Sequence, residues 1–212
     1  MGMYGRLRRI TPAELERLRN NPEGVEELVS GESVANAEAA EAALARVQKI
    51  VTEFQISAKA SDPVEQEKIR ALILKDLEAS RVRIPDESTE DGLRLEKSWH
   101  VIHYLLTGKI DKAPPPLGNA VLGGEEIGEE RDYGRVRFLT PQEVREVAEA
   151  LAPISKDDLV RRFDIEGMRA AQVIYPIRST SEGKLAQHYF ERLSRYYADA
   201  AGNGDAMLLW IE

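Results

Sequence analysis

The chain contains no cysteine, only three histidines and no long hydrophobic run. Without cysteine it can form no disulfide, thiolate nucleophile or cysteine-ligated zinc site. No stretch approaches the roughly 18 apolar residues of a membrane helix. The first residues lack the apolar run of a signal peptide and miss the myristoylation pattern, because Arg6 stands where serine or threonine is needed. We therefore expect a cytoplasmic protein with no membrane contact.

The charge balance is acidic, with a formal net charge of -8. A phosphate-tracking surface needs a cationic excess, so this balance predicts no general nucleic-acid binding and suits a basic protein partner. The hydrophobic fraction of 42% and the length of 212 residues are those of a folded domain. We expect one domain over residues 1–212.

Two segments repeat the same local pattern. Residues 5–15 and 134–144 each read glycine, short apolar-polar strand, Thr-Pro-x-Glu and an amphipathic run. Thr11 and Thr140 each start a capping box with proline at the first helical position. Two interpretations remain open: convergence on a favourable strand-to-helix turn, which the physics favours, or a structural pseudo-repeat with both strands in one sheet.

Residues 34–82 have the pattern of a helical hairpin. Apolar residues recur at three- and four-residue steps from Ala37 to Ala58, and Pro63 starts a second helix. The simpler interpretation is a hairpin packed on itself or on the domain. The alternative is an interaction arm for homodimerisation or partner binding.

Residues 93–107 are predicted to form one helix ended by Gly108. Helical spacing places Leu95, Trp99, Ile102 and Leu106 on a single stripe that faces the core. The same spacing places Glu96, His100 and His103 together on the flank beside that stripe. With Tyr104, these are the candidate catalytic residues.

Glu96, His100 and His103 form the one carboxylate-plus-two-histidine cluster in the sequence. Such a trio can hold a divalent metal or supply a general base with its orienting partner. The histidines are three apart with the glutamate before both, unlike familiar helical zinc motifs. The spacing favours a structural role, with His103 hydrogen-bonded in the core beside Trp99 and His100 at a seam. We expect no metal and no cofactor.

The candidate binding residues are polar or aromatic. Arg6 and Arg8 lie on one face of their strand by period two, as do Arg135 and Arg137 on theirs. If the two strands are neighbours, four guanidiniums converge and attract an anion; paired arginines on a solvated sheet edge are the simpler interpretation. Trp99 and Asn119 are the other two candidate binding residues. Asn119 could frame a pocket, but a role in a turn or a helix cap is the simpler interpretation.

The segments together predict an α+β, helix-rich fold. We expect a small mixed sheet of about four strands, surrounded by helices, with the 34–82 hairpin inserted. The expected strands are residues 3–10, 134–139, 172–176 and 206–211.

Several blocks, in order along the chain, resemble the YfbM-like family, the bacterial domain of unknown function 1877. The similar blocks are residues 1–3, 97–108, 116–124, 133–134, 139–144 and 204–211. The resemblance implies a compact mixed α/β fold and a bacterial cytosolic origin, and it implies no reaction. The resemblance does not cover residues 34–90, so we interpret the predicted hairpin as an addition to the family's domain.

Two functional hypotheses follow. The first, which the acidic balance and the accessory hairpin favour, is a non-enzymatic cytosolic protein-binding module of regulatory or toxin-immunity type. The second is a small-ligand-binding protein or hydrolase-like enzyme that uses Glu96, His100 and His103.

Overall fold

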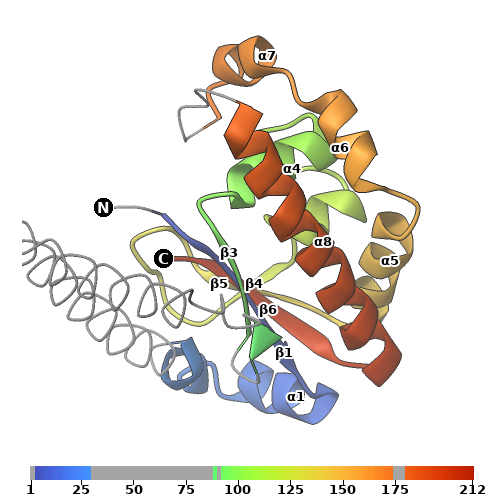
Figure 1. Ribbon diagram of the computed structural model, residues 1–212. Coiled ribbons are helices and arrows are strands. Elements are labelled where there is room, and N and C mark those ends of the chain that lie inside the picture. Colours follow the sequence, from blue (N-terminus) through green and yellow to red (C-terminus); the bar gives the residue numbers. More distant parts are fainter. Residues whose placement is uncertain (1–2, 30–87, 90–91, 174–179) are drawn as a thin grey trace, which may run out of the picture. The chain divides into compact units, whose positions relative to one another are not determined.

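The computed structural model describes residues 3–29, 88–89, 92–173 and 180–212 (Figure 1). The elements discussed below belong to the unit made of residues 1–26 and 87–212. The predicted hairpin at 34–82 lies outside the described residues and stays a prediction.

A six-stranded sheet runs through this unit in the order β2-β3-β1-β6-β5-β4. The strands are β1 (Gly5–Ile10), β2 (Ser88–Thr89), β3 (Gly92–Glu96), β4 (Glu125–Ile127), β5 (Val136–Leu139) and β6 (Ala206–Ile211). The α+β class is confirmed, but each neighbouring pair is antiparallel, so the expectation of a mixed sheet was wrong. The sequence pattern also missed β2, β3 and β4.

One expected strand has no counterpart among the described residues. Gln172 lies in a turn and Val173 in no regular element, while residues 174–176 lie outside the described part of the chain.

Both Thr-Pro turns form the predicted capping boxes. Thr11 starts α1 (Pro12–Asn20), and its hydroxyl oxygen accepts from the Glu14 backbone N–H while Glu14 accepts from the Thr11 backbone N–H. The hydrogen bonds from Thr11 lower the pKa of Glu14 because they favour its charged form. Thr140 and Glu143 repeat the arrangement at the start of α5 (Pro141–Leu151).

The other helices that bear on the site are α4 (Trp99–Thr107), α6 (Lys156–Arg162), α7 (Ile165–Ala170), α8 (Thr180–Asn203) and the 3-10 turn η1 (Leu117–Ala120). Figure 1 shows α4, α5, α6 and α8 gathered on one face of the sheet and α1 on the other. Leu139 and Leu209 belong to the buried cluster that contains Val144 of α5. On the opposite face, Arg19 of α1 lies over the Phe138 ring at 5.6 Å.

The two strand-to-helix units are related through β6. Strands β1 and β5 both pair with β6 antiparallel, so they run parallel to each other on its two sides. Their helices α1 and α5 cover opposite faces. A twofold rotation about the axis of β6 would therefore place the β1–α1 unit approximately on the β5–α5 unit. The two strands β1 and β5 belong to one sheet but are not hydrogen-bonded to each other, because β6 lies between them.

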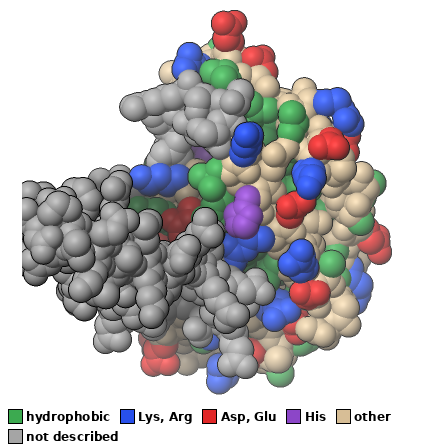
Figure 2. Space-filling view, in the orientation of Figure 1, with side chains coloured by type: hydrophobic (Ala, Val, Ile, Leu, Met, Phe, Trp, Pro, Cys, Tyr) green, Lys and Arg blue, Asp and Glu red, His purple; other side chains and the backbone are tan. Residues whose placement is uncertain are grey.

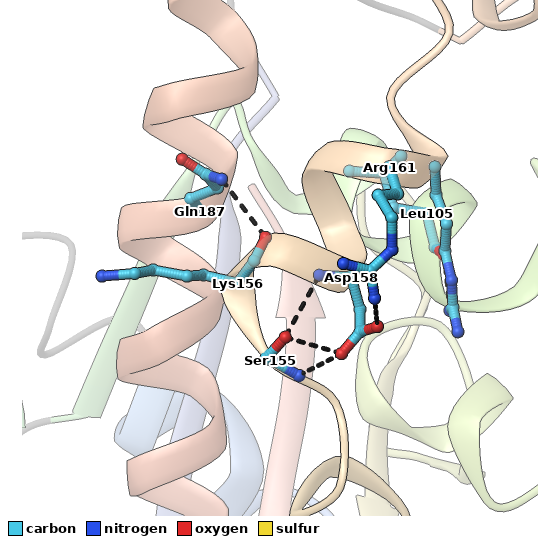
Figure 3. Close-up of polar contacts among 7 residues, drawn as sticks. Leu105, Ser155, Lys156, Asp158, Arg161 and Gln187 are labelled. Atoms are coloured by element: carbon cyan, nitrogen blue, oxygen red, sulfur yellow. Dashed lines mark hydrogen bonds and ion pairs between the residues drawn. The ribbon is translucent and has the colours of Figure 1, made fainter.

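Short polar contacts dock α6 between α4 and α8 (Figure 3). Ser155 and Asp158 form its capping box, and Arg161 pairs with Asp158. The Gln187 amide of α8 donates to the Lys156 carbonyl oxygen at 3.2 Å. Arg162 donates to the Leu105 carbonyl oxygen of α4 at 3.2 Å. Backbone carbonyls thus tie three helices that the sequence separates widely.

The expectation of one helix over residues 93–107 was wrong at its beginning. Gly92–Glu96 is strand β3, and the helix α4 begins only at Trp99. Leu93 and Leu95 face the helical layer while Arg94 pairs in register with Arg6 on the other face. The turn between the two elements starts at Glu96, whose φ of 48° lies in the left-handed region.

A close approach between Gly5 and Trp99 yields the first testable prediction. A Cβ added at Gly5 would lie 2.5 Å from the Trp99 Cβ, so Gly5→Ala must push α4 away from β1. We expect it to lower the free energy of unfolding by about 1–3 kcal/mol, measured by urea denaturation.

Gly202→Ala is the matched control. Gly202 lies in α8 with no atom within 4 Å of an added Cβ, so we expect stabilisation of up to about 1 kcal/mol. A Gly5→Ala protein as stable as the wild type would contradict the prediction.

Candidate functional site

The two histidines of α4 bond to the backbone that follows it. Gly108 ends α4 in the left-handed conformation, with its N–H donating to the Tyr104 carbonyl oxygen at 2.7 Å. The chain then returns to the side of the helix that carries the histidines. His100 Nε2 lies 2.9 Å from the Ile110 carbonyl oxygen, and His103 Nε2 lies 2.7 Å from that of Asp111. A carbonyl can only accept, so each Nε2 carries the proton.

The histidines are sealed in the core, with exposures of 2% for His100 and 0% for His103. Burial lowers the pKa of both, and the bonds to the Ile110 and Asp111 carbonyls offset this only in part. Both imidazoles are therefore neutral at neutral pH. The structural interpretation placed His103 hydrogen-bonded in the core and His100 at a seam, and both side chains are enclosed and bonded to backbone carbonyls.

The Glu96–His100–His103 cluster does not assemble as predicted. Glu96 ends strand β3, so it is not on the histidine helix. No group of three or more histidine and acidic side chains in the described part of the chain could hold a metal ion. Tyr104 is half-buried and packs against the core.

Trp99 joins the histidine helix to the first strand. Its indole Nε1 donates to the Met3 carbonyl oxygen at 3.2 Å, and its ring stacks on His100 with centroids 4.8 Å apart. The side chain is 4% exposed. The Trp99 side chain therefore packs between the sheet and the rest of α4, held by its hydrogen bond to Met3.

The four arginines do not converge. Arg6 pairs with Trp210 and Arg137 with Leu209, and these adjacent residues of β6 point to opposite faces. Arg8 shares the face of Arg6. Because β1 and β5 are separated by β6, the condition for a four-arginine cluster fails.

Arg6 and Arg135 each have a carboxylate partner. Arg6 is 8% exposed, and its Nε donates to Glu212 Oε1 at 2.8 Å, with Nη2 bonded to the same oxygen. Arg135 is exposed and lies just before β5, with its Nε 3.1 Å from Glu130 Oε2. No sequence pattern joined Arg6 to the far end of the chain.

Arg137 is buried without such a partner. Its side chain is 7% exposed, and Nη1 donates to the Leu122 carbonyl oxygen at 2.7 Å. Its Nε is buried with no hydrogen-bond partner. Burial lowers the pKa of Arg137, while the charge of Glu126 opposes that shift. An arginine stays protonated even so, and a buried positive charge therefore remains.

Arg137 and Trp99 line one cavity of about 300 Å³. We call it the Trp99–Arg137 cavity. Its charged lining residues are Lys112, Glu126, Arg135 and Arg137; the others are Met3, Trp99, Leu122, Tyr133, Gly134 and Ile211. Figure 1 shows the segment before β5, in yellow, beside the C-terminal end of β6.

Sequence reasoning named Trp99, Arg135 and Arg137 and missed the rest of this cavity. Lys112, Glu126 and Tyr133 come from separate loops and strands, and no local periodicity links them. Asn119 lies elsewhere: its side chain packs against Gly123, and its carbonyl oxygen accepts from the Tyr197 hydroxyl at 3.3 Å.

Fold and cavity together define a small α+β domain with an antiparallel sheet, a helical layer and a cationic hollow beside the chain ends. A family model described as "Domain of unknown function (DUF1877)" matches residues 1–210, and the chain belongs to that family. The match includes residues 34–90, which the sequence resemblance left out.

One solved structure is similar over nearly the whole length. It is the crystal structure of a protein of unknown function, YfbM from Escherichia coli, with 16% identity, a TM-score of 0.56 and coverage of 99% of each chain. At this identity the likeness shows the fold. No curated protein matches the chain. Among the described residues, no helix has the length and apolar character needed to cross a bilayer.

The buried histidines predict acid sensitivity. Unfolded imidazoles bind protons as the pH falls through their ordinary pKa of 6.5, whereas the folded ones resist until lower pH. The unfolded state then holds more protons, so stability is full above that pH and falls below it, by up to about 1.4 kcal/mol per pH unit for each histidine. Urea denaturation at about pH 7.5 and about pH 5.5 measures this difference.

The double variant His100→Gln/His103→Gln tests the assignment. Each glutamine amide can donate to the same carbonyl but does not titrate, so we expect a smaller loss between the two pH values. His188→Gln, which changes an exposed histidine of α8, should keep the wild-type difference. An unchanged pH dependence in the double variant would count against the buried histidines as its source.

The two buried arginines should differ in their effect on stability. Arg6→Met leaves Glu212 without its cation and should lower the free energy of unfolding by about 1–3 kcal/mol. Arg137→Met removes a buried charge that bonds to no carboxylate, at the loss of one hydrogen bond, and should change stability by less than about 1 kcal/mol. Urea denaturation measures both changes. If Arg137→Met lowers the free energy of unfolding more than Arg6→Met does, the charge of Arg137 is balanced within the folded protein and the prediction is wrong.

Proposed function

We propose that the chain is a non-enzymatic protein-binding module of the cytoplasm, of regulatory or toxin-immunity type, which binds its partner at the Trp99–Arg137 cavity. The supporting observation is that Trp99, Tyr133, Arg135 and Arg137 all line this one hollow. Tryptophan, tyrosine and arginine are the residues most enriched at binding hot spots. A recessed wall with an exposed aromatic at its rim suits an anchoring side chain of a partner.

Tyr133 is the most accessible hydrophobic residue of this surface. It is one of three large hydrophobic residues that are exposed in the described part of the chain, at 38%. A tyrosine offers a large rigid contact area with a polar tip. Lys112 and Glu126, which also line the cavity, form an exposed pair at 3.1 Å, and a polar rim of this kind is usual in protein interfaces.

The enzyme alternative gains no geometric support. A general base must come within hydrogen-bond reach of its substrate. His100 and His103 are enclosed, with Nε2 engaged by backbone carbonyls. Their burial and bonding support the structural role.

The face over α8 offers less selectivity. Figure 2 shows basic and acidic side chains interspersed across it. Alternating charges of this kind favour solubility over the choice of one partner. The arm at 34–82, predicted for homodimer or partner binding, lies outside the described residues and remains an alternative surface.

Affinity capture with matched variants tests the proposal. Immobilised wild-type protein, Tyr133→Ser and Val160→Ser are incubated with extract of the source cell at cytosolic salt, and retained proteins are quantified. Val160 is 52% exposed on α6, away from the cavity residues, so its variant controls for loss of a surface hydrophobic. We expect a partner held by the wild type and Val160→Ser and reduced about tenfold or more by Tyr133→Ser.

Recovery of the lone protein, or equal retention by all three proteins, would refute binding at this surface. Calorimetry of the purified partner with the same three proteins then gives the affinities directly.

A further inference from the structure

Arg137, which lines the Trp99–Arg137 cavity, has a buried hydrogen-bond donor without a partner. Arg137 Nη1 is bonded to the Leu122 carbonyl, whereas Nε is buried and unpartnered. Nε and Nη2 share one edge of the planar guanidinium. That edge matches the two oxygens of a carboxylate, which arginine binds through two parallel hydrogen bonds.

The lining lacks the anion that this arginine needs. It holds three cations, Lys112, Arg135 and Arg137, and the carboxylate of Glu126, and Arg135 already pairs with Glu130 at 3.1 Å. Glu126 is itself paired with Lys112 at 3.1 Å. Buried charges in proteins are normally paired, so an unpaired guanidinium in a hollow indicates a ligand-supplied counterion.

The walls favour an organic anion. Trp99, Leu122 and Ile211 supply apolar surface next to Arg137, and the low local dielectric strengthens an ion pair formed there. A volume of about 300 Å³ accommodates one acidic side chain or the last residue of a peptide. A carboxylate on a short apolar stem meets both the donors and the walls.

We propose that the Trp99–Arg137 cavity is a carboxylate-binding site whose Arg137 fork receives an acidic side chain or a C-terminal carboxylate of the partner protein. Only the source of the carboxylate rests on the proposed function; the site itself follows from the buried, unpartnered Nε of Arg137 and the residues that line the cavity with it.

Titration with small mimics tests this site by nitrogen-labelled NMR. N-acetylphenylalanine carries a terminal carboxylate, the α-amide of N-acetylglutamate carries a side-chain carboxylate, and N-acetylphenylalanine amide is neutral. The readouts are the Arg137 Nε–H and the Trp99 indole N–H, the latter assigned with Trp210→Phe. We expect saturable shifts in the millimolar range with at least one acid and about tenfold or more weaker binding of the neutral amide.

Two conservative variants separate the site from general stability. Arg137→Lys keeps the charge but loses the fork and should weaken acid binding about tenfold or more, followed at the indole. Arg6→Lys changes an arginine of nearly equal burial on the opposite face and should bind within about twofold of the wild type. Whichever acid binds more tightly identifies the source of the carboxylate.

The proposal is overturned if neither acid gives a saturable shift, if the neutral amide binds equally, or if Arg137→Lys binds like the wild type. Its failure is separable from that of the proposed function. If the small acids bind the wild type but no partner protein is captured, the protein-binding role is refuted and the carboxylate site stands. If a partner is captured by both the wild type and Arg137→Lys while no small acid binds, the carboxylate site alone is refuted.

Discussion

Strand β6 is the element on which the rest of this fold depends. Each of its six residues is buried, from Ala206 to Ile211, and β1 and β5 meet only through it in the described sheet. A strand that is covered on both faces must be apolar throughout. The two flanking strands carry buried arginines that point to opposite faces of the sheet. Arg6 meets Glu212, while Arg137 enters the cavity.

Features set by neighbouring residues could be predicted from the sequence. The capping boxes at Thr11 and Thr140, the left-handed stop at Gly108 and the two-sided burial of β6 each need only a few adjacent side chains. Strand β3 could not be separated from α4 on this basis. Leu93 to Glu96 alternates with period two, but Leu95 also falls in helical register with Trp99, so a short strand was interpreted as a helical turn.

The candidate site depended on contacts that no local pattern contains. The burial of His100 and His103 follows from the return of the chain after Gly108, which brings the Ile110 and Asp111 carbonyls to them. Likewise, Gly5 and Gly134 occupy equivalent places in the two repeated segments but serve different needs. Gly5 admits the Trp99 side chain, whereas Gly134 has a φ of 90° and open space around it. Repeated sequence therefore indicated shared architecture and not shared surroundings.

The acidic balance of the chain and its cationic cavity are compatible. At physiological ionic strength, charges separated by more than about 8 Å are largely screened, so the net charge of -8 acts mainly on long-range encounter. A carboxylate already inside the cavity meets the nearby charge of Arg137, because Lys112 and Arg135 are paired with Glu126 and Glu130. Distant carboxylates therefore slow the approach of an acidic partner but have little effect on its affinity once it is bound. Such an arrangement disfavours loose association with anions and retains those whose shape brings a carboxylate to the Arg137 fork.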